Sequence, residues 1–307
     1  MLNISAVERD TGLSKDTLRM WERRYGFPEP QRDPNGERLY PLSQVEKLRL
    51  IKRLMDRGHR PGKIISHCIE DLLTLGSASG DAVESNADLH DFLALIQAHQ
   101  LPDLRRHLAQ TLMKQGLQRF VLDTVAPLNV AVGDAWMRGD FAIFEEHLYT
   151  EQVQSILRNV LVSIQQQGRA PRVLLTSLPN EPHGLGLLMV EALLTVEGAS
   201  CIPLGTETPC GEIVRAAQAH RADVVALSFS AAFNERQATA GLAELRAQLP
   251  ESVPIWAGGT AVMRMRKPVP GVDLVRGLEE LGDKLRAWRK QHAALQATSP
   301  GVGPDVR

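Results

Sequence analysis

The second half of the chain alternates between short apolar segments and helical segments, and this alternation constrains the fold more than any other feature. The pattern predicts strands at residues 173–178, 199–203, 223–229, 254–257 and 272–275, with helices at 184–196, 212–220, 232–248 and 278–292. Such alternation is typical of a parallel, doubly wound sheet, whose ligands lie at the carboxyl ends of the strands. We therefore expect an α/β domain over residues 169–292.

Polar side chains and glycines follow several of these strands. Glu181 and His183 follow the first strand, Ser228 and Ser230 the third, and Gly258-Gly259 the fourth. A neutral imidazole binds transition-metal ions well, and a carboxylate two residues away can accept its other ring N–H. The alternative interpretation is a polar turn that contains a histidine by chance. The first turn lacks the third glycine of a dinucleotide-binding loop, and no acidic residue ends the second strand.

The spacing of these residues resembles that of B12-binding domains. Glu181-x-His183-x-x-Gly186 is followed after 41 residues by Ser228-x-Ser230 and after a further 27 by Gly258-Gly259. The resemblance implies a Rossmann-like, flavodoxin-type fold in which His183 is the lower axial ligand of cobalt and Glu181 its hydrogen-bond partner. The cofactor's displaced nucleotide tail is expected beside Gly186, Ser228 and Gly258-Gly259. Glu181 and Ser230 replace the commoner Asp and Leu, and Ser230 is expected to alter the contacts around the buried base.

The first 75 residues carry the pattern of a winged helix–turn–helix. A short helix ends at Gly12, Ser14 caps a second helix over residues 15–24, and a Pro- and Gly-containing wing over 27–41 includes a return strand at 37–40. Further helices are expected from residues 41 and 61. The stretches SKDTLRMWERRYG (14–26) and GERLY (36–40) resemble the MerR family of DNA-binding regulators. This resemblance implies operator DNA as a partner.

The candidate DNA contacts lie on the second helix and on the wing. Lys15, Arg19 and Arg23 are four residues apart on one helix face, which in other helices is commonly just solvated. The first 70 residues hold 14 Lys+Arg against 10 Asp+Glu, so DNA contact depends on the placement of side chains rather than on bulk charge. Arg38 and Tyr40 are expected to reach phosphate or the minor groove. The complete candidate set is Lys15, Thr17, Arg19, Arg23, Arg24, Tyr25, Arg38 and Tyr40.

The remaining segments connect and complete these two domains. Residues 76–87 predict a flexible linker, residues 88–168 a bundle of about four helices, and residues 293–307 a disordered tail. The three cysteines show no metal-ligand spacing, and Cys201 and Cys210 are expected to fill small buried positions. No signal peptide or membrane-spanning segment is evident, so we expect a cytoplasmic protein without a membrane partner.

The order of the three domains resembles the CarH/LitR family of cobalamin-dependent photoreceptor repressors. In that family a Trp, nine residues and Glu-His cover the adenosyl group of adenosylcobalamin, and Trp136, Glu146 and His147 match that pattern. Without the resemblance, Trp136 is equally consistent with a core residue. Met137 stands where other members have a histidine that captures cobalt after illumination, so His147 or water is expected to take that role.

The resemblance implies a regulator rather than an enzyme. In darkness adenosylcobalamin is expected to favour a homo-oligomer, a tetramer, that binds the operator and represses transcription. Light is expected to cleave the cobalt–carbon bond, reduce the oligomer and release the DNA. The alternatives are a light-independent corrinoid-responsive regulator that uses methylcobalamin or another cobalamin, a regulator with an empty B12-like domain, and a corrinoid subunit of a methyltransferase.

Overall fold

The computed structural model describes residues 1–34, 36–56, 59–77, 87–138, 140–164, 168–231, 233–263, 265 and 267–298. The chain forms two compact units, which differ from the division into domains expected at residues 75, 87 and 168. One unit comprises Met1–Leu104 and Pro127–Tyr149, and the other Arg105–Ala126 and Thr150–Arg307. Most of the expected linker, residues 78–86, lies outside the described residues.

The N-terminal domain is a winged helix–turn–helix within the first unit. Its strands form a three-stranded antiparallel sheet in the order β1-β3-β2, of which only the return strand β3 was expected. The helix expected from residue 61 is two separate helices. The elements are β1 (Leu2–Asn3), α1 (Ile4–Thr11), α2 (Lys15–Tyr25), β2 (Gln31–Arg32), β3 (Arg38–Tyr40), α3 (Leu42–Asp56), α4 (Pro61–Ile64) and α5 (Ile69–Ser77).

Caps and apolar spacing explain the two helices of this motif. The Ser14 side chain accepts a hydrogen bond from the Thr17 N–H at the start of α2, as expected for an N-cap. Gly12 and Gly26 follow α1 and α2 with φ of 69° and 68°, a left-handed conformation that glycine adopts without strain. Leu18 and Trp21 lie three residues apart on the buried face of α2, at 0% and 1% exposure, so the opposite face points to solvent.

The middle of the chain is helical, with breaks near the expected positions. Its elements are α6 (Ala87–Gln97), α7 (Leu101–Gln115), α8 (Leu117–Arg119), the π-helix η1 (Phe120–Val125), α9 (Ala126–Arg138) and α10 (Ile143–Ser163). Because α8, η1 and α9 follow one another directly, they form one continuous helical run. The boundaries between the two compact units fall within α7, between Ala126 and Pro127, and within α10.

The C-terminal domain is a doubly wound α/β fold within the second unit, as predicted. Its five parallel strands have the order β5-β4-β6-β7-β8. The elements are β4 (Arg169–Thr176), α11 (Leu185–Val196), β5 (Ala199–Gly205), α12 (Cys210–Ala219), β6 (Val224–Ser228), α13 (Glu235–Gln248), β7 (Ile255–Gly258), α14 (Thr260–Met263), β8 (Val272–Val275) and α15 (Glu280–Thr298). The expectation of a disordered tail from residue 293 is wrong for residues 293–298, because α15 continues to Thr298. Residues 299–307 lie outside the described part.

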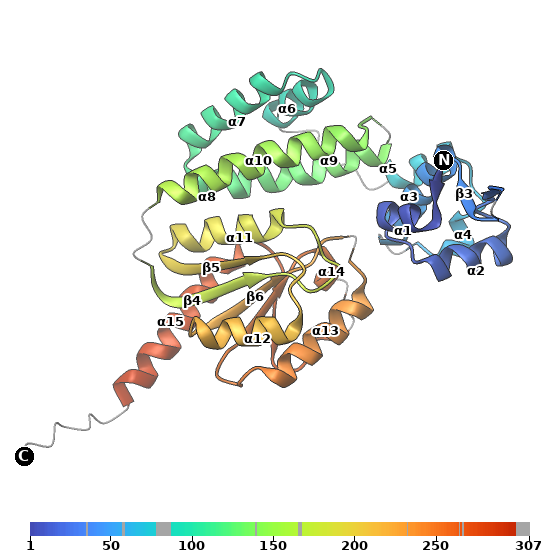
Figure 1. Ribbon diagram of the computed structural model, residues 1–307. Coiled ribbons are helices and arrows are strands. Elements are labelled where there is room, and N and C mark those ends of the chain that lie inside the picture. The colour runs from blue at the N-terminus through green and yellow to red at the C-terminus, as the bar shows by residue number, and fades with distance from the viewer. Residues whose placement is uncertain are drawn as a thin grey trace, which may run out of the picture. The chain divides into compact units, whose positions relative to one another are not determined.

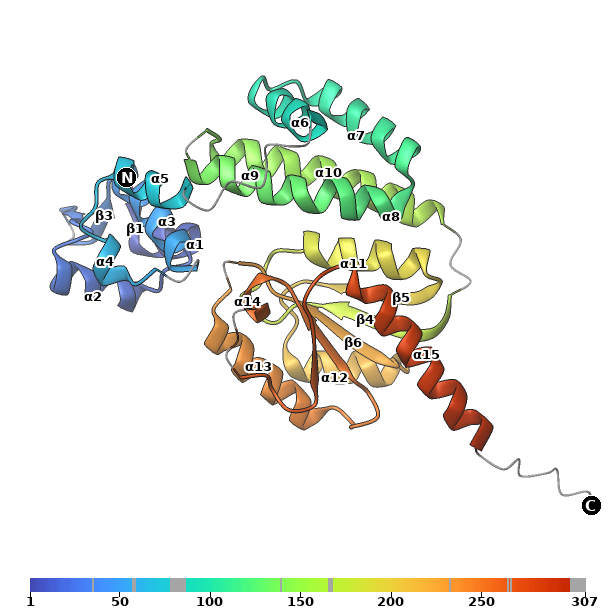
Figure 2. The same cartoon turned by 180° about the vertical axis from the view of Figure 1, so that it is seen from behind.

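The sheet of this domain is buried on both faces. Helices α12 and α13 cover one face, and α11 and α15 cover the other (Figure 1, Figure 2). Leu174, Val225 and Ile255 lie side by side in the register and belong to the core under α12 and α13. Val173 and Leu175, at 0% and 1% exposure, alternate with Leu174 and therefore face the α11 side. Helix α11 also packs against α8 and η1 of the same unit.

Two further expectations concern the cysteines and the membrane. Cys201 and Cys210 are buried, as expected, and burial raises the pKa of the Cys201 thiol to about 12. Such a thiol stays protonated and serves as a small apolar side chain. Among the described helices, none combines the length and the apolar character needed to cross a membrane.

Candidate functional site

The candidate site of the second unit lies at the carboxyl ends of β4 and β6. Strand β4 pairs with β5 on one side and with β6 on the other, so the loops after β4 and β6 leave the sheet where the strand order reverses. Ligands of flavodoxin-type folds bind at this position. The loop after β4 carries Glu181 and His183, and the residues after β6 include Ser230.

The Glu181 carboxylate is the centre of this arrangement. It is 1% exposed, whereas the His183 side chain is 58% exposed. Oxygen Oε1 lies 2.7 Å from His183 Nδ1 and accepts from the His183 N–H at 3.1 Å. The Ser230 N–H donates to Oε2 at 2.7 Å, and the Ser230 hydroxyl donates to Oε1 at 3.2 Å. A buried carboxylate thus holds an exposed imidazole through one ring nitrogen.

The hydrogen bonds determine the charge of Glu181 and the tautomer of His183. Burial alone raises the pKa of Glu181, but the hydrogen bonds from His183 and Ser230 outweigh burial and hold the pKa below its ordinary value. An ionised carboxylate only accepts hydrogen bonds, so it assigns the proton of the neutral imidazole to Nδ1. The lone pair of His183 then belongs to Nε2, the nitrogen suited to bind a metal ion.

The network around Glu181 changes the role expected for Ser230. Its replacement of leucine was expected to alter contacts around a buried base. The structure shows instead that Ser230 donates two hydrogen bonds to the carboxylate that holds His183.

A second cluster joins the start of α11 to the end of β6. A Cβ atom added to Gly186 would lie 2.5 Å from the Ser228 hydroxyl oxygen, so the two residues expected beside the nucleotide tail are in close contact. Any side chain at position 186 would therefore clash with Ser228. Ser228 is also the register partner of Gly258 in β7. The structure therefore brings Gly186, Ser228 and Gly258 to one edge of the sheet.

Gly259 must lack a side chain because the backbone after β6 lies against it. Gly259 has φ +97°, and an added Cβ would lie 2.2 Å from the Phe229 carbonyl oxygen. Its missing side chain therefore leaves room for the backbone after β6 rather than for a ligand. Gly258 has ordinary space, since its nearest neighbour would be the Val275 carbonyl oxygen at 3.4 Å.

The residues of the second unit fit a cobalamin. Among the described residues, no group of three or more His, Cys, Asp and Glu side chains could hold a metal ion. A corrin ring supplies the equatorial nitrogens of its own cobalt, so one oriented imidazole is sufficient to hold it from the protein side. His183 provides that imidazole, and its side chain is 58% exposed.

The residues expected above the cofactor belong to the first unit. Trp136 is half-buried in α9 and packs against the core of the N-terminal domain, while His147 in α10 is exposed. Glu146 Oε2 lies 3.3 Å from His147 Nδ1. Trp136 and His147 line one pocket of about 670 Å³, together with Phe141 and Phe144. The side chain of Met137 lies outside the described residues.

The DNA-binding candidates on α2 are divided between exposed and tethered side chains. Arg19 and Arg23 are exposed on the face opposite Leu18 and Trp21, and Arg24 is exposed at the end of the helix. The Arg19 guanidinium lies 3.4 Å from the Asp16 carboxylate, and the Lys15 ammonium lies 3.6 Å from the Glu8 carboxylate. These surface ion pairs are weak and can exchange for phosphate contacts.

Four other candidates have structural roles. Tyr40 is 0% exposed in the core of the domain, so its expected contact with DNA is wrong. Arg38 binds Glu22 at 2.9 Å and is half-buried. Tyr25 packs against the same core under the Arg24 guanidinium, which lies 5.2 Å from the ring centroid. The Thr17 hydroxyl lies 2.8 Å from the Ser14 hydroxyl and thus belongs to the cap of α2.

Known protein families match both the N-terminal helix–turn–helix domain and the C-terminal α/β domain. The family described as MerR HTH family regulatory protein matches residues 2–68, and the B12 binding domain matches residues 171–283. The HTH-type transcriptional repressor CarH of Myxococcus xanthus is 31% identical over 259 residues, which are 81% of this chain and 86% of CarH. The repressor CarA of the same organism is 31% identical over 286 residues, 91% of this chain and 94% of CarA.

The chain belongs to the CarH/CarA family of HTH-type transcriptional repressors. It is accordingly a MerR-type regulator with a B12-binding domain and not an enzyme. The structure of the monomethylamine corrinoid protein of Methanosarcina barkeri covers 64% of this chain and 96% of its own, with a TM-score of 0.51 and 14% identity. That likeness shows a shared fold.

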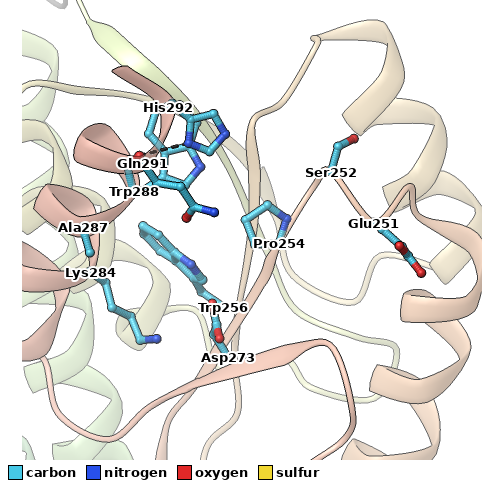
Figure 3. Close-up of a pocket in the computed structure, with 10 residues that line it drawn as sticks. All are labelled: Glu251, Ser252, Pro254, Trp256, Asp273, Lys284, Ala287, Trp288, Gln291 and His292. Carbon is cyan, nitrogen blue, oxygen red and sulfur yellow. Dashed lines mark hydrogen bonds between the residues drawn. The ribbon is translucent and has the colours of Figure 1, made fainter. Parts of the chain in front are cut away.

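A pocket of the α/β domain lies between α15 and the beginning of β7, away from Glu181 and His183. Its volume is about 370 Å³, and it is lined by Trp256 and by Trp288 and His292 of α15 (Figure 3). The rings of Trp288 and His292 are stacked with centroids 3.7 Å apart. None of the residues assigned from the sequence lines this pocket.

Replacing Glu181 by glutamine tests the hydrogen-bond network of the CarH/CarA-type site. The amide keeps the shape of the side chain but lacks the charge, and its NH2 group cannot accept from His183 or Ser230. We expect the affinity for cobalamin to fall by roughly 10- to 100-fold, the usual effect of losing such a partner. Titration of the apo-protein with cobalamin, followed by absorption, measures the change. An unchanged affinity would show that Glu181 does not prepare His183 for cobalt.

Proposed function

We propose that this regulator binds adenosylcobalamin and uses it to control its hold on operator DNA. The observation that carries the proposal is the exposed His183 imidazole, held through Nδ1 by the buried Glu181 carboxylate. This geometry supports His183 Nε2 as the lower axial ligand of cobalt. The nucleotide tail is assigned to the neighbourhood of Gly186 and Ser228, where the start of α11 meets the end of β6 and the Ser228 hydroxyl can donate a hydrogen bond. Bound adenosylcobalamin supplies a cobalt–carbon bond that light can break.

The upper face is assigned to Trp136 and Glu146. An indole is a broad apolar cover for an adenosyl group, and the Glu146 carboxylate can accept hydrogen bonds from adenosine N–H or ribose O–H groups. His147 is the imidazole next to Glu146, and His147 or water is assigned the place of the histidine that is absent at Met137. These assignments rest on the spacing that the chain shares with light-responsive members of its family.

Regulation follows from the difference in binding between two states of the protein. With the adenosyl group in place, Trp136 and Glu146 favour the state that assembles into a tetramer and presents its helix–turn–helix domains to an operator. Loss of the adenosyl group removes those contacts, so the population shifts to a smaller form that releases DNA. The regulator then represses transcription in darkness and permits it in light.

Size-exclusion chromatography with adenosylcobalamin, in darkness and after green light, tests cofactor, light and assembly together. We expect the larger species only in darkness with adenosylcobalamin, and operator binding in parallel with it. An elution volume that stays the same with and without cofactor, and before and after illumination, would contradict the proposed regulation.

A second candidate function is a corrinoid-responsive regulator that ignores light. Met137, in place of the histidine of light-responsive members, favours it. Operator affinity would then depend on cobalamin, with methylcobalamin as one candidate form, but would be the same before and after illumination. Operator affinity measured with adenosylcobalamin, in darkness and after green light, therefore separates the two functions.

Arginines on the exposed face of α2 are expected to carry operator binding. Arg19→Ala and Arg23→Ala should each weaken binding by roughly three- to tenfold and reduce the salt dependence where the contact is to phosphate. Tyr40→Phe is the matched control, because the Tyr40 hydroxyl is buried and has no hydrogen-bond partner among the described residues. Fluorescence anisotropy with labelled operator measures all three variants. Normal affinity in both arginine variants, or a loss in Tyr40→Phe, would discredit the assigned DNA-binding face.

A further inference from the structure

Ser177 is a fully buried serine that joins the loop carrying His183 to the loop after β5. Its exposed fraction is 0%. Its hydroxyl donates to the Glu181 carbonyl oxygen at 2.6 Å and accepts from the Glu207 N–H at 2.9 Å. Its own carbonyl oxygen accepts from the Thr208 N–H at 2.9 Å. One side chain thus connects the loops that follow two neighbouring strands.

The loop after β5 is itself held to the sheet. The Thr176 hydroxyl donates to the Gly205 carbonyl oxygen at 3.0 Å and lies 2.7 Å from the Thr208 hydroxyl. The loop after β5, whose Glu207 N–H donates to Ser177, is therefore anchored to β4. On the other side, Ser177 restrains the backbone of Glu181, whose carboxylate holds His183.

We propose that Ser177 is a positioning residue for His183. Its hydroxyl fixes the Glu181 backbone against the loop after β5, so the carboxylate and the imidazole keep the orientation needed for cobalt. The inference rests on the proposed function, since it concerns the same cobalamin site. Without the hydroxyl, the backbone of a residue that is 1% exposed loses a hydrogen bond and the loop gains freedom. Part of the binding energy is then used to order the loop.

Three variants separate positioning from general stability. Ser177→Ala removes the hydroxyl, and Ser177→Cys keeps a side chain in place but provides only a weak donor. Thr195→Val is the matched control, because the hydroxyl of Thr195, a buried residue of the same domain, donates to the Cys201 sulfur at 3.8 Å and not to the loop that carries His183. Thermal unfolding of the full-length variants compares their stability.

Two readouts report on His183. Absorption titrations with adenosylcobalamin give the affinity. Electron paramagnetic resonance of bound cob(II)alamin, in protein labelled with 15N-histidine, gives the fraction of cobalt that is coordinated by histidine. We expect Ser177→Ala to bind roughly three- to tenfold more weakly and to lose part of the histidine coupling. Ser177→Cys should be intermediate, and Thr195→Val should match wild type in both readouts.

The outcomes distinguish this inference from the proposed function. Wild-type affinity and full histidine coupling in Ser177→Ala would overturn the role of Ser177 alone. Equal losses in Thr195→Val, or failure of both Ser177 variants to fold, would show a purely structural role and overturn it as well. Wild type that binds no cobalamin would overturn the proposed function, and this inference with it.

Discussion

His183→Ala is expected to weaken binding of adenosylcobalamin by more than about a hundredfold, because removing a metal ligand costs more than removing its hydrogen-bond partner. His183 supplies the only imidazole in the loop after β4, and Glu181 orients it at 2.7 Å. The Glu181 carboxylate would also lose its ring partner. The measurement is an absorption titration of the apo-protein in darkness, combined with the test for histidine coordination.

His220→Ala provides the control for this variant. His220 is an exposed histidine of the same domain, at the end of α12, and should bind cobalamin as wild type does. Full retention of cobalamin by His183→Ala, with unchanged spectra, would exclude His183 as the axial ligand. Operator binding without cofactor should stay the same in both variants, because neither change lies in the helix–turn–helix domain.

Gly259→Ala is expected to lower the free energy of unfolding of the α/β domain by about 2–4 kcal/mol. The φ of +97° is strained for any residue with a side chain, and the new Cβ would lie 2.2 Å from the Phe229 carbonyl oxygen. Phe229 is 0% exposed, and its N–H donates to the Gly258 carbonyl oxygen at 3.0 Å, so this backbone cannot shift without breaking the end of the sheet. Urea denaturation followed by circular dichroism measures the loss.

The neighbouring glycine provides a matched control. Gly258→Ala would place its Cβ at 3.4 Å from the Val275 carbonyl oxygen, an ordinary contact, and should change the free energy of unfolding by less than about 1 kcal/mol. Equal losses in the two variants would contradict the separate roles given to these glycines.

Local patterns predicted most of the secondary structure. Ser14 caps α2, Gly12 ends α1, and the apolar spacing of Leu18 and Trp21 identifies the buried face, because each of these signals acts within a few residues of the chain. The alternation of strands and helices likewise predicted the parallel sheet, since crossovers of this length allow little else. The helix end at Thr298 escaped prediction because it lies beyond the apolar pattern.

The sequence by itself determined the class of the protein and the positions of Glu181, His183, Gly186 and Ser228, because these residues recur at characteristic spacings. Only the tertiary structure decided what each side chain contacts. In the tertiary structure Tyr40 is buried and the Ser230 hydroxyl donates to Glu181. Ser177 connects the loop after β4 to the loop after β5. The physical reason is that burial and hydrogen bonding depend on residues far apart in the chain, such as Glu181 and Ser230, which meet only when β4 and β6 pair side by side.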